Sequence, residues 1–497
     1  MLDKNTAQTE YQLVRCFYYS ISFCCFAAVK VFLIRVAMVI GPTPPGTGVI
    51  NPAFFSADSN STSPQSFPFS RRFMPTSMTT APSLIISPVI KFAFPTATTR
   101  ISACSDTSTA EVITAHQGEI KDISSLELVK DMKIGWSLGN TLDGGGQSSK
   151  GSSPETIERA WGNPVTTKEM IDEIKNAGFN VLRVPTTWDW STGDAPDYKI
   201  SDEWLARVKE VVVYGMANDM YVILNIHHET WHYPTEDNYE AASDRLKKVW
   251  TQIGNYFENY DEHLIFEGLN EPRVIGSDEE WNGGSDATRE VVNKLDADFV
   301  STIRSLGGNN KLRHLMIPGY AASSSEVALK ALKIPENDDK LIVSVHAYIP
   351  YNFALSDSKQ ANRWVACKGG FTTDIDNLAD LLKTLFIDKG QAVIIGEFGA
   401  RSKDNEKYRA EWAKYYVTKM NTIGVPCVWW DNGAFTGSGE LFGLFDRRTL
   451  EWRFPLVKDA LISASNGEYT VDGLKSDTSI LDELKKDMAE SKTDSNE

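Results

Sequence analysis

The chain has 497 residues, of which 42% are hydrophobic and 23% charged, the composition of a globular protein long enough for one large barrel or two to three ordinary domains. The net charge of −16 is uneven: residues 1–105 carry eight Lys or Arg against three acidic residues, whereas the rest carries 42 basic and 63 acidic residues. An acidic body repels polyphosphate, so no nucleic-acid partner is expected, and a neutral polymer such as a polysaccharide suits it better.

Residues 1–105 predict a leader, an anchor or a disordered segment. Residues 16–40 are apolar enough to resemble a signal or a membrane anchor, although Lys30 and Arg35 interrupt them. Residues 41–100 are rich in Ser, Thr, Pro and Phe without any helical or strand period, which predicts disorder. Residues 101–105 resemble the end of a bacterial lipoprotein signal. We therefore expect a mature start near Cys104, an extracellular or cell-surface location, and a linker at 106–125; membrane anchoring stays open.

From residue 126 to 465, short apolar runs alternate with amphipathic stretches, which indicates β/α units around a parallel sheet. Eight such units predict an α/β protein with a (β/α)8 TIM barrel. A doubly wound open sheet is the alternative, but no Gly-rich phosphate turn follows the first run. Residues 466–497 are expected to form a polar tail, and the protein is expected to be a monomer. The strand-like runs are Lys133–Leu138, Asn180–Val184, Tyr221–Ile226, Leu264–Leu269, His314–Ile317, Leu341–Val345, Ala392–Ile395 and Pro426–Trp430.

Local signals add detail to this barrel. Thr166 and Glu169 have the spacing of a capping box at the start of a helix. No CxxC pair and no His/Cys cluster with zinc spacing appears, so neither a structural metal nor a cofactor is expected, and a disulfide between Cys367 and Cys427 is left open. His263 and His314 fall in no motif and are expected to be buried structural residues.

Two glutamates follow the fourth and seventh runs, where a TIM barrel carries its reacting groups. Glycoside cleavage needs such a pair: one carboxylic acid protonates the departing oxygen, and a second carboxylate, about 5–5.5 Å away in retaining enzymes, attacks the anomeric carbon. Glu271 and Glu397 are therefore the candidate catalytic residues. The competing interpretation of either glutamate alone is a salt-bridged residue on the rim.

Six runs together resemble glycoside hydrolase family 5, in the branch that contains endoglucanases, xyloglucanases and lichenases, and they match in order over about residues 126–462. The resemblance implies a retaining, endo-acting β-1,4-glucan hydrolase with Glu271 as acid/base and Glu397 as nucleophile. Xyloglucan, xylan and mannan are rival substrates. A non-catalytic carbohydrate-binding barrel and a metal-dependent hydrolase are remote alternatives, since both carboxylates are present and the sequence displays no His/Asp cluster. The six runs are Gly135-Trp136-Ser137-Leu138-Gly139-Asn140-Thr141-Leu142, Arg183-Val184-Pro185, Ile226-His227-His228, Leu269-Asn270-Glu271-Pro272, His346-Ala347-Tyr348 and Ile395-Gly396-Glu397-Phe398-Gly399.

Supporting residues are expected around the pair. Asn270 is suited to hold the sugar's 2-hydroxyl, and Arg183 to keep the nucleophile ionised. Tyr348 is expected to donate a hydrogen bond to Glu397, with His346 in the same network.

Other strand-end residues are expected to bind or support the sugar. Successive strand side chains point to opposite faces, so one of the adjacent pair His227 and His228 is expected to enter the barrel. The resemblance favours His227 for the family's invariant role, and two adjacent histidines rarely chelate one ion. Asn140, Trp136 and Trp430 complete the set, with Trp430 as the stacking platform for the ring that is cleaved. Ser137 stands where the family pattern has Asn, so a hydrogen bond there is expected to be lost or bridged by water.

Overall fold

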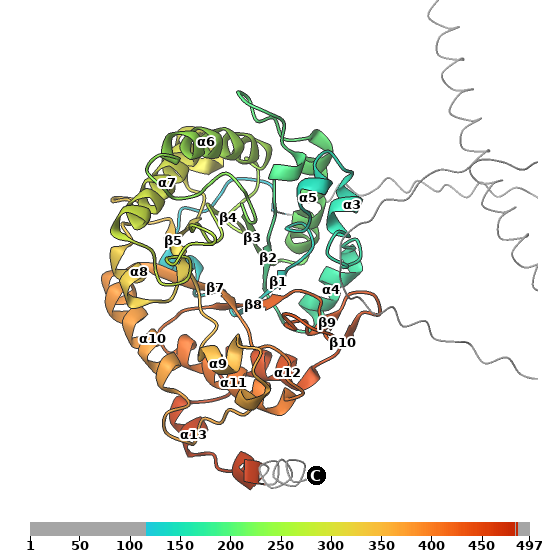
Figure 1. Ribbon diagram of the computed structural model, residues 1–497, viewed down its shortest axis with the longest axis vertical. Helices are drawn as coiled ribbons and strands as arrows, with labels where there is room; N and C mark the ends of the chain where they lie inside the picture. Colours follow the sequence, from blue (N-terminus) through green and yellow to red (C-terminus); the bar gives the residue numbers. More distant parts are fainter. Residues whose placement is uncertain (1–115, 483, 486–497) are drawn as a thin grey trace, which may run out of the picture. The chain divides into compact units, whose positions relative to one another are not determined.

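A computed structural model describes residues 116–482, 484 and 485 of the chain, and these form a closed barrel of eight parallel strands (Figure 1). The strands pair in sequence order, and β1 also pairs with β8, so the predicted barrel is confirmed and the open sheet is excluded. Every run predicted as a strand overlaps an observed strand, although β5, β6, β7 and β8 extend beyond the predicted ends. The strands are β1 Ile134–Leu138, β2 Val181–Val184, β3 Tyr221–Asn225, β4 Leu264–Glu267, β5 Leu315–Ser323, β6 Leu341–His346, β7 Ala392–Phe398 and β8 Cys427–Asp431.

Helices surround the barrel on its outside (Figure 1). A two-stranded antiparallel sheet, β9 Phe445–Asp446 with β10 Glu451–Trp452, follows β8. The helices are α2 Ser125–Leu128, α3 Pro154–Glu158, α4 Lys168–Asn176, α5 Asp202–Met216, α6 Tyr239–Tyr256, α7 Asp286–Ser305, α8 Glu326–Ala331, α9 Tyr351–Ala354, α10 Thr373–Leu385, α11 Glu406–Asn421, α12 Pro455–Ser465 and α13 Val471–Ser476.

The capping box predicted at Thr166 is wrong. Helix α4 begins at Lys168 and its N-cap is Thr167, whose side chain caps no backbone N–H. The backbone N–H of Thr166 instead donates to Glu158 at 2.8 Å. The backbone at the position of the predicted cap is therefore bound by a carboxylate from the neighbouring helix α3.

Alternate residues of each strand point to opposite faces, and this period of two divides the buried residues into an inner and an outer set. On the inner face, Ile223, Ile265 and Ile394 belong to a compact apolar cluster that α2 joins through Leu128 and Val129. Residues on the outer face pack with the helices in a second, larger cluster. The segment from residue 116 to α2, part of the predicted linker, therefore lies against the barrel end where the strands begin.

The strands lose their regular pairing near their carboxyl ends. Val345 of β6 pairs with Ile395 of β7, but the next residue, His346, pairs with Glu397 because Gly396 is skipped. Such irregularities re-aim side chains at barrel rims. A Cβ on Gly396 would lie 2.8 Å from Oγ of Ser344, so glycine is required at this close approach.

Several sequence-based expectations fall partly or wholly outside the described residues. The leader at 1–105, residues 106–115 of the linker and residues 486–497 of the tail are among them. Within the described part, Cys367 and Cys427 are free thiols, and no helix there is long and apolar enough to cross a membrane. The tail is partly packed, since α13 contacts α11 and Leu484 is buried.

Candidate active site

A polar layer lies inside the barrel, directly above the apolar inner cluster. Arg183, two residues after the inward-facing Val181, is fully buried at its centre. Its guanidinium donates to Glu267 at 2.8 Å, to Glu397 at 2.7 Å and to Asn270 at 2.6 Å. Although burial lowers the pKa of Arg183, the charges of Glu267 and Glu397 raise it above its ordinary value, so this cation is permanent.

Glu397 has a donor on each carboxylate oxygen. Arg183 binds Oε1, and the hydroxyl of Tyr348 donates to Oε2 at 2.9 Å, as expected from the sequence. Burial and the charge of Glu397 raise the pKa of Tyr348 well above its ordinary value, so this hydroxyl stays a donor. A carboxylate held by two donors in this way is fixed in orientation.

Glu271 has different neighbours. Nδ1 of His346 lies 2.7 Å from its Oε1, and Nη1 of Arg273 lies 3.3 Å from its Oε2. Burial raises the pKa of Glu271, but the hydrogen bond and charge of His346 outweigh it and leave the pKa below the ordinary value. One oxygen of Glu271, one oxygen of Glu397 and a ring nitrogen of His346 lie within 4.8 Å of one another. That spacing fits direct attack on a sugar and is too short for the about 6.5–9.5 Å of carboxylates that share a water.

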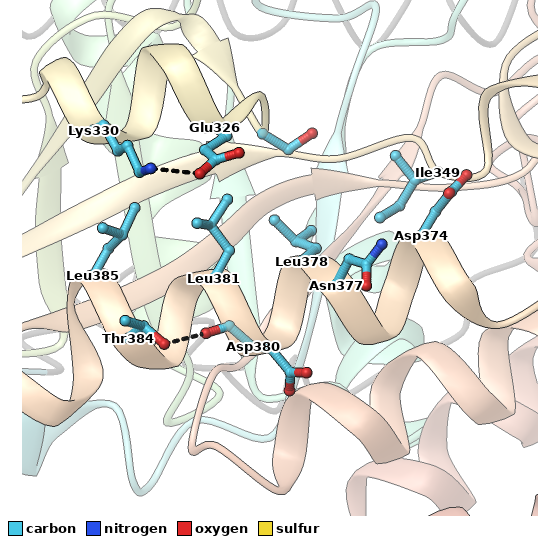
Figure 2. Close-up of a pocket in the computed structure, with 11 residues that line it drawn as sticks. Glu326, Lys330, Ile349, Asp374, Asn377, Leu378, Asp380, Leu381, Thr384 and Leu385 are labelled. Atoms are coloured by element: carbon cyan, nitrogen blue, oxygen red, sulfur yellow. Dashed lines mark hydrogen bonds and ion pairs between the residues drawn. The ribbon is translucent and has the colours of Figure 1, made fainter.

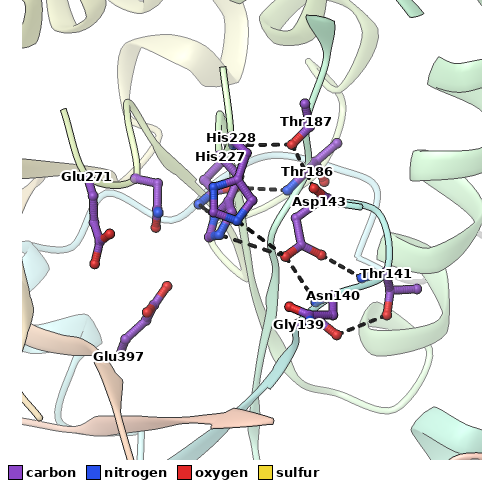
Figure 3. A network of polar contacts seen from close by, with 12 residues as sticks. Gly139, Asn140, Thr141, Asp143, Thr186, Thr187, His227, His228, Glu271 and Glu397 are labelled. Carbon is purple, nitrogen blue, oxygen red and sulfur yellow. Dashed lines mark hydrogen bonds and ion pairs between the residues drawn. The ribbon is translucent and has the colours of Figure 1, made fainter. Parts of the chain in front are cut away.

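His227 and His228 lie on the other side of the opening (Figure 3). The side chain of His227 is buried, and its Nδ1 lies 3.0 Å from the amide of Asn225. Burial, together with the charges of His228 and Arg183, lowers the pKa of His227 well below its ordinary value, so its imidazole is neutral. The His228 side chain is 41% exposed, which agrees with the expectation that only one of the two faces inward.

Asp143 organises the loop after β1 beneath these histidines (Figure 3). Its carboxylate accepts the backbone N–H groups of Asn140 at 2.9 Å and Thr141 at 2.6 Å. Asn140 has a φ of 56°, so it makes the turn that starts this loop. The Asp143 Oδ2 atom also lies 3.9 Å from Nε2 of His227 and 4.0 Å from Nε2 of His228. These three residues form a His/Asp cluster that the sequence did not reveal.

The tryptophans separate according to the face of their strand. Trp430 faces the mouth of the barrel on β8 and stacks on His227 with centroids 5.6 Å apart and a 6° tilt. Trp429, one residue earlier, is fully buried in the wall. The expectation that Trp136 contacts sugar is wrong, because its ring is fully buried on the outer face of β1, where Nε1 donates to Asp431 at 3.0 Å. Ser137 faces inward beside it, and its buried Oγ has no hydrogen-bond partner among the described residues. Whether the bond expected there is lost or bridged by water stays a prediction.

Sequence reasoning missed several residues of this site. Glu267 is fully buried and binds Arg183, Asn225 and Ser344, and a carboxylate within an apolar strand run was the available signal. Two exposed tryptophans outside the motifs were missed as well. Trp161 is 43% exposed and lies beside His228 with ring centroids 5.4 Å apart. Trp281 is 61% exposed, and the guanidinium of Arg273 covers its ring at 4.3 Å.

A separate hollow lies on the outer side of the barrel, between α8 and α10 (Figure 2). Its floor is aliphatic, with Leu378, Leu381 and Leu385 from α10, and an ion pair between Glu326 and Lys330 borders it. None of the residues lining this hollow belongs to the polar layer inside the barrel. The chemistry of the chain is therefore assigned to the barrel mouth.

A closed barrel whose fourth and seventh strands present two adjacent glutamates beside a buried arginine defines a glycoside hydrolase. The model of the cellulase family, glycosyl hydrolase family 5, matches residues 142–436. The chain belongs to glycosyl hydrolase family 5.

Named relatives agree with this assignment. Endoglucanase B of Neocallimastix patriciarum is 49% identical over 347 residues, covering 69% of this chain and 72% of that protein. Endoglucanase A of Ruminococcus albus is 46% identical, covering 70% and 94%. A solved broad-specificity endoglucanase of subfamily GH5-4 from Clostridium longisporum is 46% identical with a TM-score of 0.68, covering 70% of this chain and all of that one. A similar enzyme from Ruminococcus champanellensis, solved with bound cellotriose, is 44% identical with a TM-score of 0.66, covering 69% and 99%.

Proposed function

We propose that the protein is an endo-acting β-1,4-glucan hydrolase that retains anomeric configuration. The observation that carries the proposal is the placement of oxygens of Glu271 and Glu397 within 4.8 Å of each other at the carboxyl ends of β4 and β7. In this mechanism Glu397 attacks the anomeric carbon while Glu271 gives its proton to the departing glycosidic oxygen. Glu271 then takes a proton from water, which attacks the glycosyl-enzyme ester and frees Glu397.

The unequal surroundings of the two carboxylates support the assignment of roles. Glu397 accepts hydrogen bonds from Arg183 and Tyr348, which stabilise a charged nucleophile. Glu271 lies 2.7 Å from Nδ1 of His346, a titratable group able to exchange a proton with it. Asn270, which Arg183 holds at 2.6 Å, is the group proposed to bind the 2-hydroxyl of the sugar at the cleavage point.

Exposed aromatic rings beside residues of the site support cleavage within a long chain. Trp161 lies beside His228, and Trp281 lies in the loop after β4 against Arg273, which contacts Glu271. Rings of this kind stack on the apolar faces of pyranoses. We therefore place Trp161 and Trp281 at successive points along one glucan chain. Related solved structures contain cellotriose and cellotetraose, which fit this type of ligand.

A panel assay tests the proposal. The full chain is incubated with mixed-linkage β-glucan, carboxymethyl cellulose, xyloglucan, xylan and mannan, and new reducing ends are measured together with viscosity. We expect the highest rate on a β-glucan, with viscosity falling before much reducing sugar appears. Preference for xylan or mannan would reassign the substrate. Binding without product would favour a non-catalytic carbohydrate-binding barrel.

The cluster of Asp143, His227 and His228 calls for a second arm of this assay. We expect activity to persist in a chelator, because both proposed reacting groups are carboxylates. Loss of activity in chelator, restored by adding a divalent ion, would favour a metal-dependent hydrolase instead.

We propose further that the enzyme acts outside the cell or at its surface. Polymeric glucan does not enter cells, and residues 16–40 and 101–105 resemble export signals. Mass spectrometry of the amino terminus of the natural protein, with cell fractionation, tests this. A start near Cys104 in the medium or envelope is expected, whereas an intact Met1 in the cytosol would contradict it.

A further inference from the structure

A second group of titratable residues lies at the opposite end of the barrel. His263 directly precedes β4, and Asp219 lies two residues before β3, so both are at the ends where strands begin. His116 approaches them from the segment that leads into α2. The catalytic glutamates occupy the carboxyl ends of their strands, so this group is separate from the active site.

Three side chains converge here with the spacing of metal ligands. Nδ1 of His116 lies 2.9 Å from Oδ2 of Asp261, and Nδ1 of His263 lies 3.0 Å from Oδ1 of the same residue. The two imidazole centroids are 4.0 Å apart, and one donor atom from each of the three residues lies within 4.8 Å of the other two. Two imidazoles and one carboxylate form the kind of three-ligand set that zinc accepts, with water in the fourth position.

The backbone holds these ligands in place independently of their side chains. The N–H of Asp261 donates to the carbonyl of His116 at 2.8 Å, and the N–H of Gly118 donates to the carbonyl of Asn259 at 2.9 Å. His116 has a φ of 59°, an unusual conformation that a non-glycine residue adopts here to turn toward Asp261. Tyr221 stacks on His263 with centroids 4.7 Å apart and a 15° tilt, which fixes the orientation of that ring.

A fourth residue provides the outer contact that metal-bound histidines usually have. Oδ1 of Asp219 lies 3.0 Å from Nε2 of His116. A carboxylate on one ring nitrogen keeps the proton there and leaves the other nitrogen, here Nδ1, free for an ion.

Charge and exposure also suit a cation. Asp261 directs one carboxylate oxygen toward each of the two imidazoles, with Oδ2 toward His116 and Oδ1 toward His263. Oε1 of Glu262 lies 3.9 Å from Nδ1 of His263 and adds negative charge, which Lys121 partly offsets. The side chains of His116, Asp261 and His263 are 15%, 17% and 17% exposed, sheltered but reachable from solvent. The expectation of a buried structural His263 is therefore wrong, since the residue is only partly buried.

We propose that His116, Asp261 and His263 bind one divalent ion of the zinc class, and that Asp219 orients the ring of His116. The bound ion would hold the segment before α2 against the barrel. The sequence did not predict this site, because His116 and Asp261 are separated by 145 positions and no local spacing connects them. The ion would act on stability, because ligands that bind only the folded state raise the free energy of unfolding.

The test uses the full chain, stripped with a chelator and dialysed at neutral pH. Calorimetric titration with Zn²⁺ should show one tight site, and Zn²⁺ should raise the melting temperature. Co²⁺ should give the visible absorption of a tetrahedral site. His116→Gln and His263→Gln should weaken Zn²⁺ binding by about 100-fold or more, and Asp219→Asn by about 10–100-fold.

Matched variants distinguish ion binding at this site from ion binding at the barrel mouth. His228→Gln alters the His/Asp cluster at the barrel mouth and should leave the tight site intact. His116→Gln should keep the hydrolytic rate of the metal-free wild type, which shows that it folds. Absence of tight binding in the wild type, its retention in both His116→Gln and His263→Gln, or its loss in His228→Gln would each overturn the proposal.

Discussion

Nδ1 of His346 lies 2.7 Å from Oε1 of Glu271 and 3.6 Å from Oε2 of Glu397, so one imidazole contacts both carboxylates of the active site. Burial lowers the pKa of His346, but the charges of Glu397 and Glu271 and the hydrogen bond to Glu271 raise it above the ordinary value of 6.5. The same pairing lowers the pKa of Glu271 against the effect of burial. His346 and Glu271 therefore titrate as a pair, and the last proton leaves this pair above the normal range of a carboxyl group.

His346→Gln tests this coupling. In the wild type, the proton that Glu271 must donate stays with the pair until pH passes the raised pKa of His346. In the variant, Glu271 titrates alone as a carboxyl group, so the alkaline limb of kcat/KM should move to lower pH. At a fixed pH on that limb, activity should fall about tenfold for each pH unit of displacement. A limb at the same or higher pH in the measured profile would show that His346 does not store the proton.

Glu397→Ala should abolish turnover, because no other group in the site is proposed to attack the anomeric carbon. Sodium azide should restore part of the rate by acting as an external nucleophile, and the product should be the glycosyl azide of inverted configuration. Nuclear magnetic resonance of the product checks the configuration. Azide rescue of Glu271→Ala with the inverted product, and of Glu397→Ala with the retained one, would reverse the two roles.

Glu271→Ala should slow substrates with poor leaving groups by about 10²–10⁴-fold, because these need the proton. Aryl glycosides with activated leaving groups should lose far less in their first step. The measurement is kcat/KM across a series of aryl cellobiosides with leaving groups of different acidity. Equal losses across the series would remove Glu271 from the role of acid.

Trp430 and Trp136 form a matched pair of substitutions on two faces of the barrel wall. Trp430→Ala should lower kcat/KM through loss of the ring at the mouth, with a smaller change in melting temperature. Trp136→Ala should instead reduce the free energy of unfolding by about 3–5 kcal/mol, since it removes a fully buried ring and its bond to Asp431. Denaturant unfolding and steady-state kinetics of both variants separate these effects. A stable Trp136→Ala with impaired sugar binding would return Trp136 to the site.

Asp296 in α7 is 1% exposed, and within residues 116–482, 484 and 485 neither of its carboxylate oxygens has a hydrogen-bond partner. Burial raises its pKa well above the ordinary value of 3.8. The folded state thus keeps a proton that the unfolded state releases, so stability is lost as pH rises from about 4 toward the raised pKa. Asp296→Asn should remove this loss and stabilise the protein by about 1–3 kcal/mol at neutral pH.

Asp298 on the same helix provides the control for Asp296. It accepts hydrogen bonds from Tyr239 and Ser243 and pairs with Lys247, so Asp298→Asn should destabilise. Thermal unfolding from about pH 4 to pH 8 compares the two variants with the wild type. If the gain in stability of Asp296→Asn over the wild type did not grow as pH rises, the proposed effect of burial on Asp296 would be contradicted.

The sequence by itself determined the barrel, its strands and the two glutamates. Each strand is a short apolar run, and its polar end is adjacent in the chain, so local patterns carry this information. The period of two also implied that only one of His227 and His228 faces inward. Recognition of Glu271, Glu397, Arg183 and Tyr348 required only their order along the chain.

Only the tertiary structure decided which partners those residues meet. Trp136 and Ser137 are neighbours, yet strand register places one outside the barrel and the other inside. Glu267 is bound to Arg183, and His346 is opposite Glu397, because closure of the barrel and a skipped residue in β7 bring them together. The group of His116, Asp261 and His263 arises in the same way. Contacts between distant residues depend on how the strands close and pair, and no local pattern of residues records that geometry.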